Sequence, residues 1–566
     1  MFHRMEIMRT MAVGTLTLGL LACGPAGAVD RAPDPAAAGP VATALSQRTA
    51  EADPLAVHNF YVARSHAPVW LTAEGAPTRA ARQLVAVLSE AGSHALAPET
   101  YDAAGLAAAL AAAPRPAREA ALLELSLMQA YLDYAVDVSS GALEPARIDS
   151  DFDIEPPRPE PARLLERLAG AADVSALLED LAPQHPDYAA LRERYARYLD
   201  LAEADAWGPP VPEGPTLMEG DRSPRVRALR QRLDALAASV RQAEAPAQTR
   251  LAAAETVATD ADLGAAHDPA VYDAALMEAV RRFQARHGLN EDGLAGPATL
   301  RALNRSPAYR ARQIAVNLER LRWLNKPLGD RHVMVNLAGF RMALVDDGVE
   351  TFESRVVIGK TRFPTAEFSD VMEFMVVNPA WHVPTSIVRN EILPKLREDP
   401  TYLTRQNMVL TGVDVDPEMI AWEFITPSTF PGRVKQRPGR NNALGQVKFK
   451  FPNHHAIYLH DTPQKSLFRH DRRAYSHGCV RVMKPYEFAH RLLERQLSDP
   501  EAMFNRWLAR ETEIYVHLDD PVPVHITYRT APVAADGSDQ FRGDVYGRDR
   551  RIAAALEERG VRLPPA

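Results

Sequence analysis

The apolar residues of this 566-residue chain change their spacing near residue 333, and this change limits what the chain can fold into. From residue 55 to about 205 they recur every three or four positions, which is the period of an amphipathic α-helix. From residue 333 onward, short runs of β-branched and aromatic residues stand between Gly, Asp and Pro, which is typical of β-strands. The sequence therefore predicts a multidomain α+β protein with separate helical and mostly-β parts.

The helical part divides into two units. In the first, an all-α scaffold that we place at residues 51–215, a helix at 120–138 carries an apolar stripe that we expect to face the core. This stripe consists of Leu122, Leu125, Met128, Leu132 and Ala135. The second unit, at 216–305, has two further apolar stripes and a short helix opened by Pro297, so we expect a small three-helix domain.

The mostly-β part is expected at residues 306–530, followed by a C-terminal extension at 531–566. Its strands are expected at residues 333–337, 341–345, 353–358, 373–377, 514–518 and 524–528. Helices are expected at residues 390–399, 485–496 and 548–559.

The first 28 residues have the charge and hydropathy of an export signal. A basic start precedes an apolar run at 11–22, which is too short to span a bilayer. Two processing routes stay open: ordinary cleavage after the small residues 26–28, or a lipoprotein-like site with a lipid anchor at Cys23. Either route predicts a periplasmic protein. The Ala- and Pro-rich residues 29–50 are expected to form a flexible linker.

Cys479 is the single cysteine outside this leader, within the run Ser476-His477-Gly478-Cys479-Val480-Arg481. Once the leader is removed it cannot form an internal disulfide, so we interpret this thiol as a nucleophile. The formal net charge of −8 gives no reason to expect a nucleic-acid partner.

Alternation along two short strands brings further residues to this thiol. In the segment 456–460, Tyr458 and His460 point away from the apolar face, and in the segment 479–482, Cys479 and Arg481 do the same. If both apolar faces enter one core, these four side chains share a surface. A free thiol is mostly protonated at neutral pH, so His460 is our candidate for the base that activates it.

Gly478 permits a tight turn before the nucleophile, so the N–H groups of Gly478 and Cys479 are expected to converge on a developing oxyanion. That arrangement favours acyl transfer. The run from His460 to Arg481 resembles the signature of the L,D-transpeptidase family. Other matching stretches lie at residues 357–360, 364–365, 378–384, 441–445 and 451–453, so the resemblance covers about residues 333–518.

Residues 281–289, 292–293 and 296–300 resemble a peptidoglycan-binding domain. An Ala/Glu-rich insertion at 237–269 departs from that pattern, and a helical spacer that no longer binds glycan or peptide stays open. Taken together, the chain resembles the large periplasmic transpeptidases of Gram-negative bacteria.

The resemblance implies that Cys479 is the acylated nucleophile, that His460 is its base and that the main-chain carbonyl of Asp461 orients the imidazole. Many members have glycine or serine in place of Asp461, so its carboxylate is a second candidate participant. For His477, a turn residue that fixes the loop and a direct proton-transfer role both stay open. A cap at about 385–445 is expected to cover the cleft and to move as a lid.

Three residues are candidates for substrate binding. Tyr458 can add a hydroxyl to the oxyanion site, with ordinary packing as the alternative. Arg481 can pair with a carboxylate of the stem peptide, with a plain surface ion pair as the alternative. Trp381 lies in one of the matching stretches.

The resemblance implies a peptidoglycan L,D-transpeptidase that forms 3→3 crosslinks between diaminopimelate residues of donor and acceptor stem peptides and releases D-alanine. L,D-carboxypeptidase or hydrolase activity on the same peptides, and a non-catalytic wall-binding scaffold, are the alternatives. Other cell-wall synthesis enzymes are candidate partners, and carbapenems are candidate inhibitors.

A metal site is the remaining rival, since His454, His455, His460, His470 and His477 all precede Cys479. No His-x-x-x-His helix or Cys-x-x-Cys pair supports a catalytic zinc. We therefore expect neither a metal nor a cofactor in the reaction.

Overall fold

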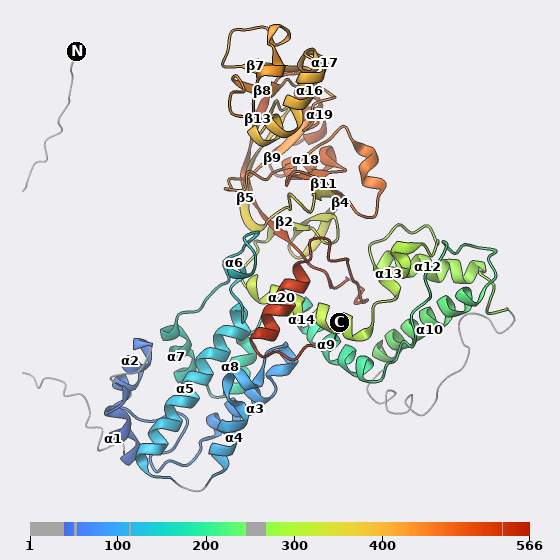
Figure 1. The fold of residues 1–566 in the computed structure, drawn as a ribbon. Coiled ribbons are helices and arrows are strands. Elements are labelled where there is room, and N and C mark those ends of the chain that lie inside the picture. Colours follow the sequence, from blue (N-terminus) through green and yellow to red (C-terminus); the bar gives the residue numbers. More distant parts are fainter. Residues whose placement is uncertain (1–38, 50–53, 113–114, 245–267, 535, 566) are drawn as a thin grey trace, which may run out of the picture.

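The computed structural model describes residues 39–49, 54–112, 115–244, 268–534 and 536–565. Figure 1 shows a helical domain, a small three-helix unit and a β-rich domain that meet around two helices, α14 (Pro307–Trp323) and α20 (Arg548–Glu558). The expected multidomain α+β fold class is confirmed. The export signal and its two processing sites lie outside the described residues. Among the helices that the structure describes, none has both the length and the apolar character that a membrane span requires.

The helical domain surrounds one long helix, α5 (Ala117–Ser140), which contains neither Gly nor Pro. The helices around it are α1 (Pro40–Ser46), α2 (Leu55–Ala63), α3 (Arg79–Ser89), α4 (Ala103–Ala111), α7 (Pro161–Gly170), α8 (Val174–Leu181) and α9 (Pro186–Glu203). The expected stripe on α5 is wrong at its start, because Leu122 is 45% exposed while Leu123 and Leu127 are buried. Since neighbouring helices pack on several sides of α5, it buries more than the single face that a stripe describes.

The interpretation of residues 29–50 as a flexible linker is wrong for residues 40–46, which form α1. Val41, Ala42 and Leu45 are at most 1% exposed, and α1 packs against α5. Three buried apolar residues on one side of a two-turn helix are sufficient to keep it helical once a partner helix covers them. Residues 29–38 lie outside the described part of the chain.

The small unit consists of α10 (Pro224–Glu244), α12 (Ala274–Arg286) and α13 (Pro297–Leu303). Val226, Leu229 and Val280, taken from the expected stripes, are fully buried in its core. The unit contacts the β-rich domain, because the Asn290 N–H donates to Asp471 Oδ1 at 2.6 Å. Most of the insertion, residues 245–267, lies outside the described residues.

Helix α14 (Pro307–Trp323) joins the domains and is buried along most of its length. Its residues Glu319 and Arg322 form an ion pair with no exposed side-chain surface, at an N–O distance of 2.5 Å. Glu319 also accepts from the N–H groups of Ala142 and Leu143, while Arg322 donates to the His94 carbonyl. This ion pair therefore ties α14 to two separate segments of the helical domain.

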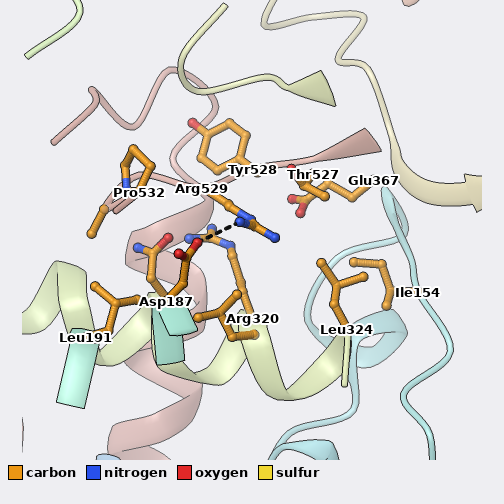
Figure 2. Close-up of a pocket in the computed structure, with 13 residues that line it drawn as sticks. Ile154, Asp187, Leu191, Arg320, Leu324, Glu367, Thr527, Tyr528, Arg529 and Pro532 are labelled. Carbon is orange, nitrogen blue, oxygen red and sulfur yellow. Dashed lines mark hydrogen bonds and ion pairs between the residues drawn. The ribbon is translucent and has the colours of Figure 1, made fainter. Parts of the chain in front are cut away.

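A small pocket lies at the same junction, between α9, α14 and the segment around Arg529 that follows the last strand (Figure 2). Arg529 donates to Asp187 of α9 across it at 3.1 Å. The residues that line this pocket belong to the domain junction. None of them lies in the Cys479 loop, residues 476–481, so we do not interpret the pocket as a substrate site.

The β-rich domain contains a ten-stranded sheet in the order β1-β5-β13-β2-β3-β4-β12-β10-β9, with β11 paired to β4. Because β9 also pairs with β5, the sheet closes on itself. The strands are β1 (Phe152–Asp153), β2 (Arg331–Asn336), β3 (Arg341–Asp346), β4 (Val349–Gly359), β5 (Glu367–Val377), β9 (Val447–Lys450), β10 (Leu459–His460), β11 (Ala474–Ser476), β12 (Val480–Val482) and β13 (Ile514–Thr527). Helices α18 (Pro485–Leu493) and α20 (Arg548–Glu558) lie at the expected segments 485–496 and 548–559. Helix α19 (Pro500–Leu508) is an additional helix.

The two strands expected at 514–518 and 524–528 are a single strand, β13, with a register shift between His517 and Val522. Pro521 lies within the shifted segment. Proline cannot donate to the ladder, so a bulge accommodates it without ending the strand.

A cap is inserted between β5 and β9 and has its own core. It consists of β6 (Trp381–His382), α15 (Thr385–Ile387), the π-helical turn η5 (Val388–Ile392), α16 (Leu393–Glu398), α17 (Tyr402–Arg405), β7 (Met408–Thr411) and β8 (Arg433–Gln436). Its strands form a second sheet in the order β6-β8-β7, and Ile392, Leu396 and Trp422 are among its buried residues. The cap lies at the end of the molecule opposite the helical domain (Figure 1).

Replacing Glu319 with alanine should lower the free energy of unfolding by about 3–5 kcal/mol, because Arg322 is left buried without its counter-charge. Urea unfolding of the full chain, followed by circular dichroism, measures the loss. The matched control is Arg312→Ala, which removes a partly exposed ion pair with Glu557 and should cost roughly 1 kcal/mol or less. Equal losses in the two variants would contradict this account.

Candidate active site

The position of the site follows from how β10 pairs with β12. The two strands are parallel, with Leu459 opposite Val480 and His460 opposite Arg481. Leu459 and Val480 are fully buried in the core of the β-rich domain. Residues that pair directly present their side chains on the same face of a sheet. Tyr458, His460, Cys479 and Arg481 therefore share the opposite face, as the alternation in the sequence indicates.

The His460 ring is buried and held in one orientation. Its Nδ1–H donates to the main-chain carbonyl of Asp461, so Nε2 carries the free lone pair. Burial lowers the pKa of His460 to about 3, and the positive charge of Arg481 acts in the same direction. The imidazole is therefore neutral at physiological pH and can accept a proton.

The thiol of Cys479 is half-buried and protonated at rest. Its Sγ donates to the Ala456 carbonyl at 3.7 Å. Burial raises the pKa of Cys479 above its ordinary value, and hydrogen bonds from Tyr458 and the charges of Lys450 and Arg481 offset part of this rise. Cys479 and His460 are thus both uncharged at rest, rather than a thiolate and an imidazolium.

The loop before Cys479 is fixed by two hydroxyl groups. Ser476 Oγ accepts from the Gly478 N–H at 3.1 Å and donates to the Cys479 carbonyl at 2.5 Å. Thr365 Oγ1 donates to the Gly478 carbonyl at 2.7 Å. Gly478 has a φ of +115°, a backbone conformation that other residues rarely adopt.

This geometry does not support the expected oxyanion role of the Gly478 amide. Its N–H already donates to Ser476 Oγ inside the loop, so it is not free to bind a developing oxyanion. The Cys479 amide and the Tyr458 hydroxyl, whose hydrogen bond reaches the Cys479 sulfur, remain the candidate donors. Gly478 contributes the turn itself.

The carboxylate of Asp461 is engaged away from the thiol. Its Oδ1 accepts from Lys465 Nζ at 2.7 Å, and its Oδ2 accepts from the Gln446 N–H at 2.9 Å. A Cβ at Gly445 would lie 2.2 Å from Oδ2, so only glycine leaves room for this carboxylate. The contacts therefore favour the carbonyl role over direct participation of the carboxylate.

Arg481 has no acidic partner among the described residues. Its Nη1 donates to the neutral amide of Gln464 at 2.6 Å, and its buried Nε has no hydrogen-bond partner. The interpretation of Arg481 as a plain surface ion pair is therefore wrong. This guanidinium can still accept an anionic ligand.

Two lysines that sequence reasoning missed lie on the same face. Lys448 of β9 is directly opposite His460, and Lys450 Nζ lies 5.3 Å from the centre of the Tyr458 ring. The signal in the sequence is the alternation in 447–450, where Val447 and Phe449 are buried and the two lysines point away. The face around Cys479 is therefore positively charged.

His477 and Trp381 lie toward the cap. His477 Nε2 is 2.7 Å from Glu391 Oε1 of η5, and its ring stacks on Phe363 with centroids 4.9 Å apart. These contacts favour a loop-fixing role for His477 over proton transfer. Trp381 packs against the buried core of the cap.

Comparison with known proteins gives three family matches. Residues 330–524 match the L,D-transpeptidase catalytic domain, residues 222–303 match a domain described as "Putative peptidoglycan binding domain", and residues 55–194 match a scaffold domain. A curated relative from Haemophilus influenzae, named "Putative L,D-transpeptidase", is 36% identical over 246 residues, which cover 43% of this chain and 49% of the relative. The chain thus matches about half the length of that relative.

Two solved structures are also similar. The L,D-transpeptidase from Xylanimonas cellulosilytica is 15% identical, with 56% of this chain and 98% of that chain covered and a TM-score of 0.17. The L,D-transpeptidase from Stackebrandtia nassauensis is 13% identical, with 56% and 96% covered and a TM-score of 0.20.

Alkylation of Cys479 by iodoacetamide should accelerate about tenfold per pH unit through neutral pH, because only the thiolate reacts. Burial raises the pKa of this thiol above the ordinary 9.0, so the rate should still be rising at pH 9. Replacing Lys450 with methionine should move the midpoint to higher pH, whereas Lys435→Met, in the cap, should leave it unchanged. A plateau already reached near neutral pH would show a stabilised thiolate instead.

Proposed function

We propose that this chain, whose residues 330–524 belong to the L,D-transpeptidase catalytic-domain family, crosslinks peptidoglycan stem peptides through a thioester on Cys479. The observation that carries the proposal is the register of β10 and β12, which puts His460 and Cys479 on one face of adjacent strands. A cysteine thiol and an oriented neutral imidazole on one face are the two groups from which a thiol nucleophile and its general base are built. The family and the peptidoglycan-binding match make peptidoglycan the substrate class.

The first half-reaction begins with proton transfer. Rotation about the Cα–Cβ bond of Cys479 turns Sγ from the Ala456 carbonyl toward His460 Nε2. The imidazole takes the thiol proton while sulfur attacks the carbonyl of the third residue of a donor tetrapeptide. The Cys479 amide and the Tyr458 hydroxyl stabilise the oxyanion.

The burial of His460 assists the next step. Because burial lowers the pKa of His460 to about 3, the imidazolium formed during attack readily gives its proton to the departing D-alanine amine, while the same shift raises the cost of the first proton transfer. A thioester on Cys479 remains. The side-chain amine of a diaminopimelate residue in a second stem peptide then attacks the thioester, with His460 accepting the proton, and a 3→3 crosslink is released.

The positive face around the thiol supports the same substrate. Stem peptides carry free carboxylates, and a carboxylate can form a bidentate pair with an arginine. Arg481 has a buried Nε without a partner, and Lys448 and Lys450 add two positive charges beside it. We propose that Arg481 binds a donor carboxylate and thereby positions the scissile carbonyl at Cys479.

The remaining domains support action on an assembled wall. The unit at 222–303 would hold the chain to peptidoglycan, and the export signal expected at 1–28 would deliver it to the periplasm. The cap contacts the catalytic loop through Glu391 and His477 and would open to admit a stem peptide.

Replacing Cys479 with alanine should abolish crosslinked product, because the proposed thioester forms on the Cys479 sulfur. Purified protein is incubated with tetrapeptide-containing peptidoglycan, and the muropeptides are separated and identified by mass. Cys479→Ala should also remove the covalent adduct that a carbapenem forms with the parent, seen as added intact mass. Unchanged 3→3 products in the variant would refute the mechanism, whereas tripeptides without crosslinks in the parent would identify a carboxypeptidase.

Replacing Arg481 with glutamine should raise the KM for the tetrapeptide donor by about tenfold or more, since a charge-assisted hydrogen bond is lost. The matched control is Arg472→Gln, an exposed arginine in the same segment, which should leave the KM unchanged. Steady-state kinetics on both variants provide the measurement. An effect on kcat alone, with the KM unchanged, would remove Arg481 from substrate binding.

A further inference from the structure

A group of three side chains outside the site has the composition of a metal-binding site. Asp153, His454 and His455 each present one ligand atom, and these atoms all lie within 4.8 Å of one another. Asp153 belongs to β1, which lies between helices of the helical domain in the sequence, whereas the two histidines lie in the loop just before β10. The group therefore joins segments that are 302 residues apart in the sequence.

We propose that Asp153, His454 and His455 bind a Zn²⁺ ion that fastens strand β1 to the loop preceding β10. Two imidazole nitrogens and one carboxylate oxygen form a donor set that suits zinc, whereas calcium and magnesium prefer oxygen ligands alone. Three protein ligands leave a fourth position for water.

The distances match such a site. Zinc binds nitrogen and oxygen at about 2.1 Å, so neighbouring ligand atoms of a tetrahedral site lie roughly 3.4 Å apart. Asp153 Oδ2 is 3.0 Å from His455 Nε2 and 3.6 Å from His454 Nε2. The centroids of the two imidazole rings are 4.0 Å apart and their planes are tilted by 38°, and both Nε2 atoms lie near the same carboxylate oxygen.

Contacts with the rest of the fold also hold the ligands in place. Asp153 pairs with Phe368 of β5 in the sheet, and the ring of Phe368 lies 5.2 Å from that of His455. In the loop, Asn453 donates to the Ile457 carbonyl and accepts from the Ile457 N–H, which closes a turn around both histidines. His454 and Asp153 are 73% and 41% exposed, so the ion and its water can enter from solvent.

The other histidines of this stretch have different partners. His460 donates to the Asp461 carbonyl, His477 contacts Glu391, and the ring of His470 lies against that of Tyr475. The proposed ion is thus separate from the thiol chemistry. It is nevertheless next to it, because the residue after His455 is Ala456, whose carbonyl accepts from Cys479 Sγ.

The test measures zinc binding to the full chain by equilibrium dialysis against ZnSO₄. All proteins carry Cys479→Ala, so that the thiol cannot bind the metal itself. The parent should bind one zinc ion per chain, and Asp153→Asn, His454→Ala and His455→Ala should each weaken binding at least about tenfold. His470→Ala, an exposed histidine in the same stretch, should bind as the parent does.

His454→Ala is the decisive variant, because its side chain is largely exposed and its loss should not disturb folding. Zinc should raise the thermal midpoint of the parent and of His470→Ala but not that of His454→Ala. Co²⁺ should give visible bands of a tetrahedral nitrogen and oxygen site. No zinc binding by the parent, or equal binding by His454→Ala and His470→Ala, would overturn the proposal.

Discussion

The parallel register between β10 and β12 is the constraint on which the site depends. Because Leu459 and Val480 fill the same core, a slip of one residue would turn His460 into the core and leave an apolar residue beside the thiol. The register is held from the other side as well, since β9 pairs with both β10 and β5 and closes the sheet. Strands of two and three residues can therefore position catalytic groups that they could not hold alone.

Burial favours the uncharged form of both Cys479 and His460. It raises the pKa of Cys479 and lowers the pKa of His460, so each group is uncharged in the resting protein. The protonated thiol is less open to oxidation than a thiolate. Lys450 and Arg481 favour the anionic sulfur. The arrangement thus keeps the thiol protonated at rest, and the two positive charges offset part of what burial adds to the cost of its ionisation.

Alternation in the sequence was sufficient to find the shared face of Tyr458, His460, Cys479 and Arg481, because a strand fixes the side of each residue locally. The direction of the Gly478 amide could not be found in this way. It depends on the Ser476 hydroxyl and on the turn that Thr365 supports from another segment. The approach of Asp153 to the histidines depends on pairing across three hundred residues, for which periodicity carries no signal.

Several parts of this long chain support the Cys479 loop. The cap reaches it through Glu391. The C-terminal segment reaches it through Tyr546, whose hydroxyl donates to the Gly359 carbonyl at 2.7 Å and accepts from the N–H of Thr365, the residue that holds Gly478. The helical domain reaches the neighbouring loop through Asp153. The Cys479 loop is thus held from two directions and the loop beside it from a third, and such contacts keep a backbone in place, which is what a preorganised site requires.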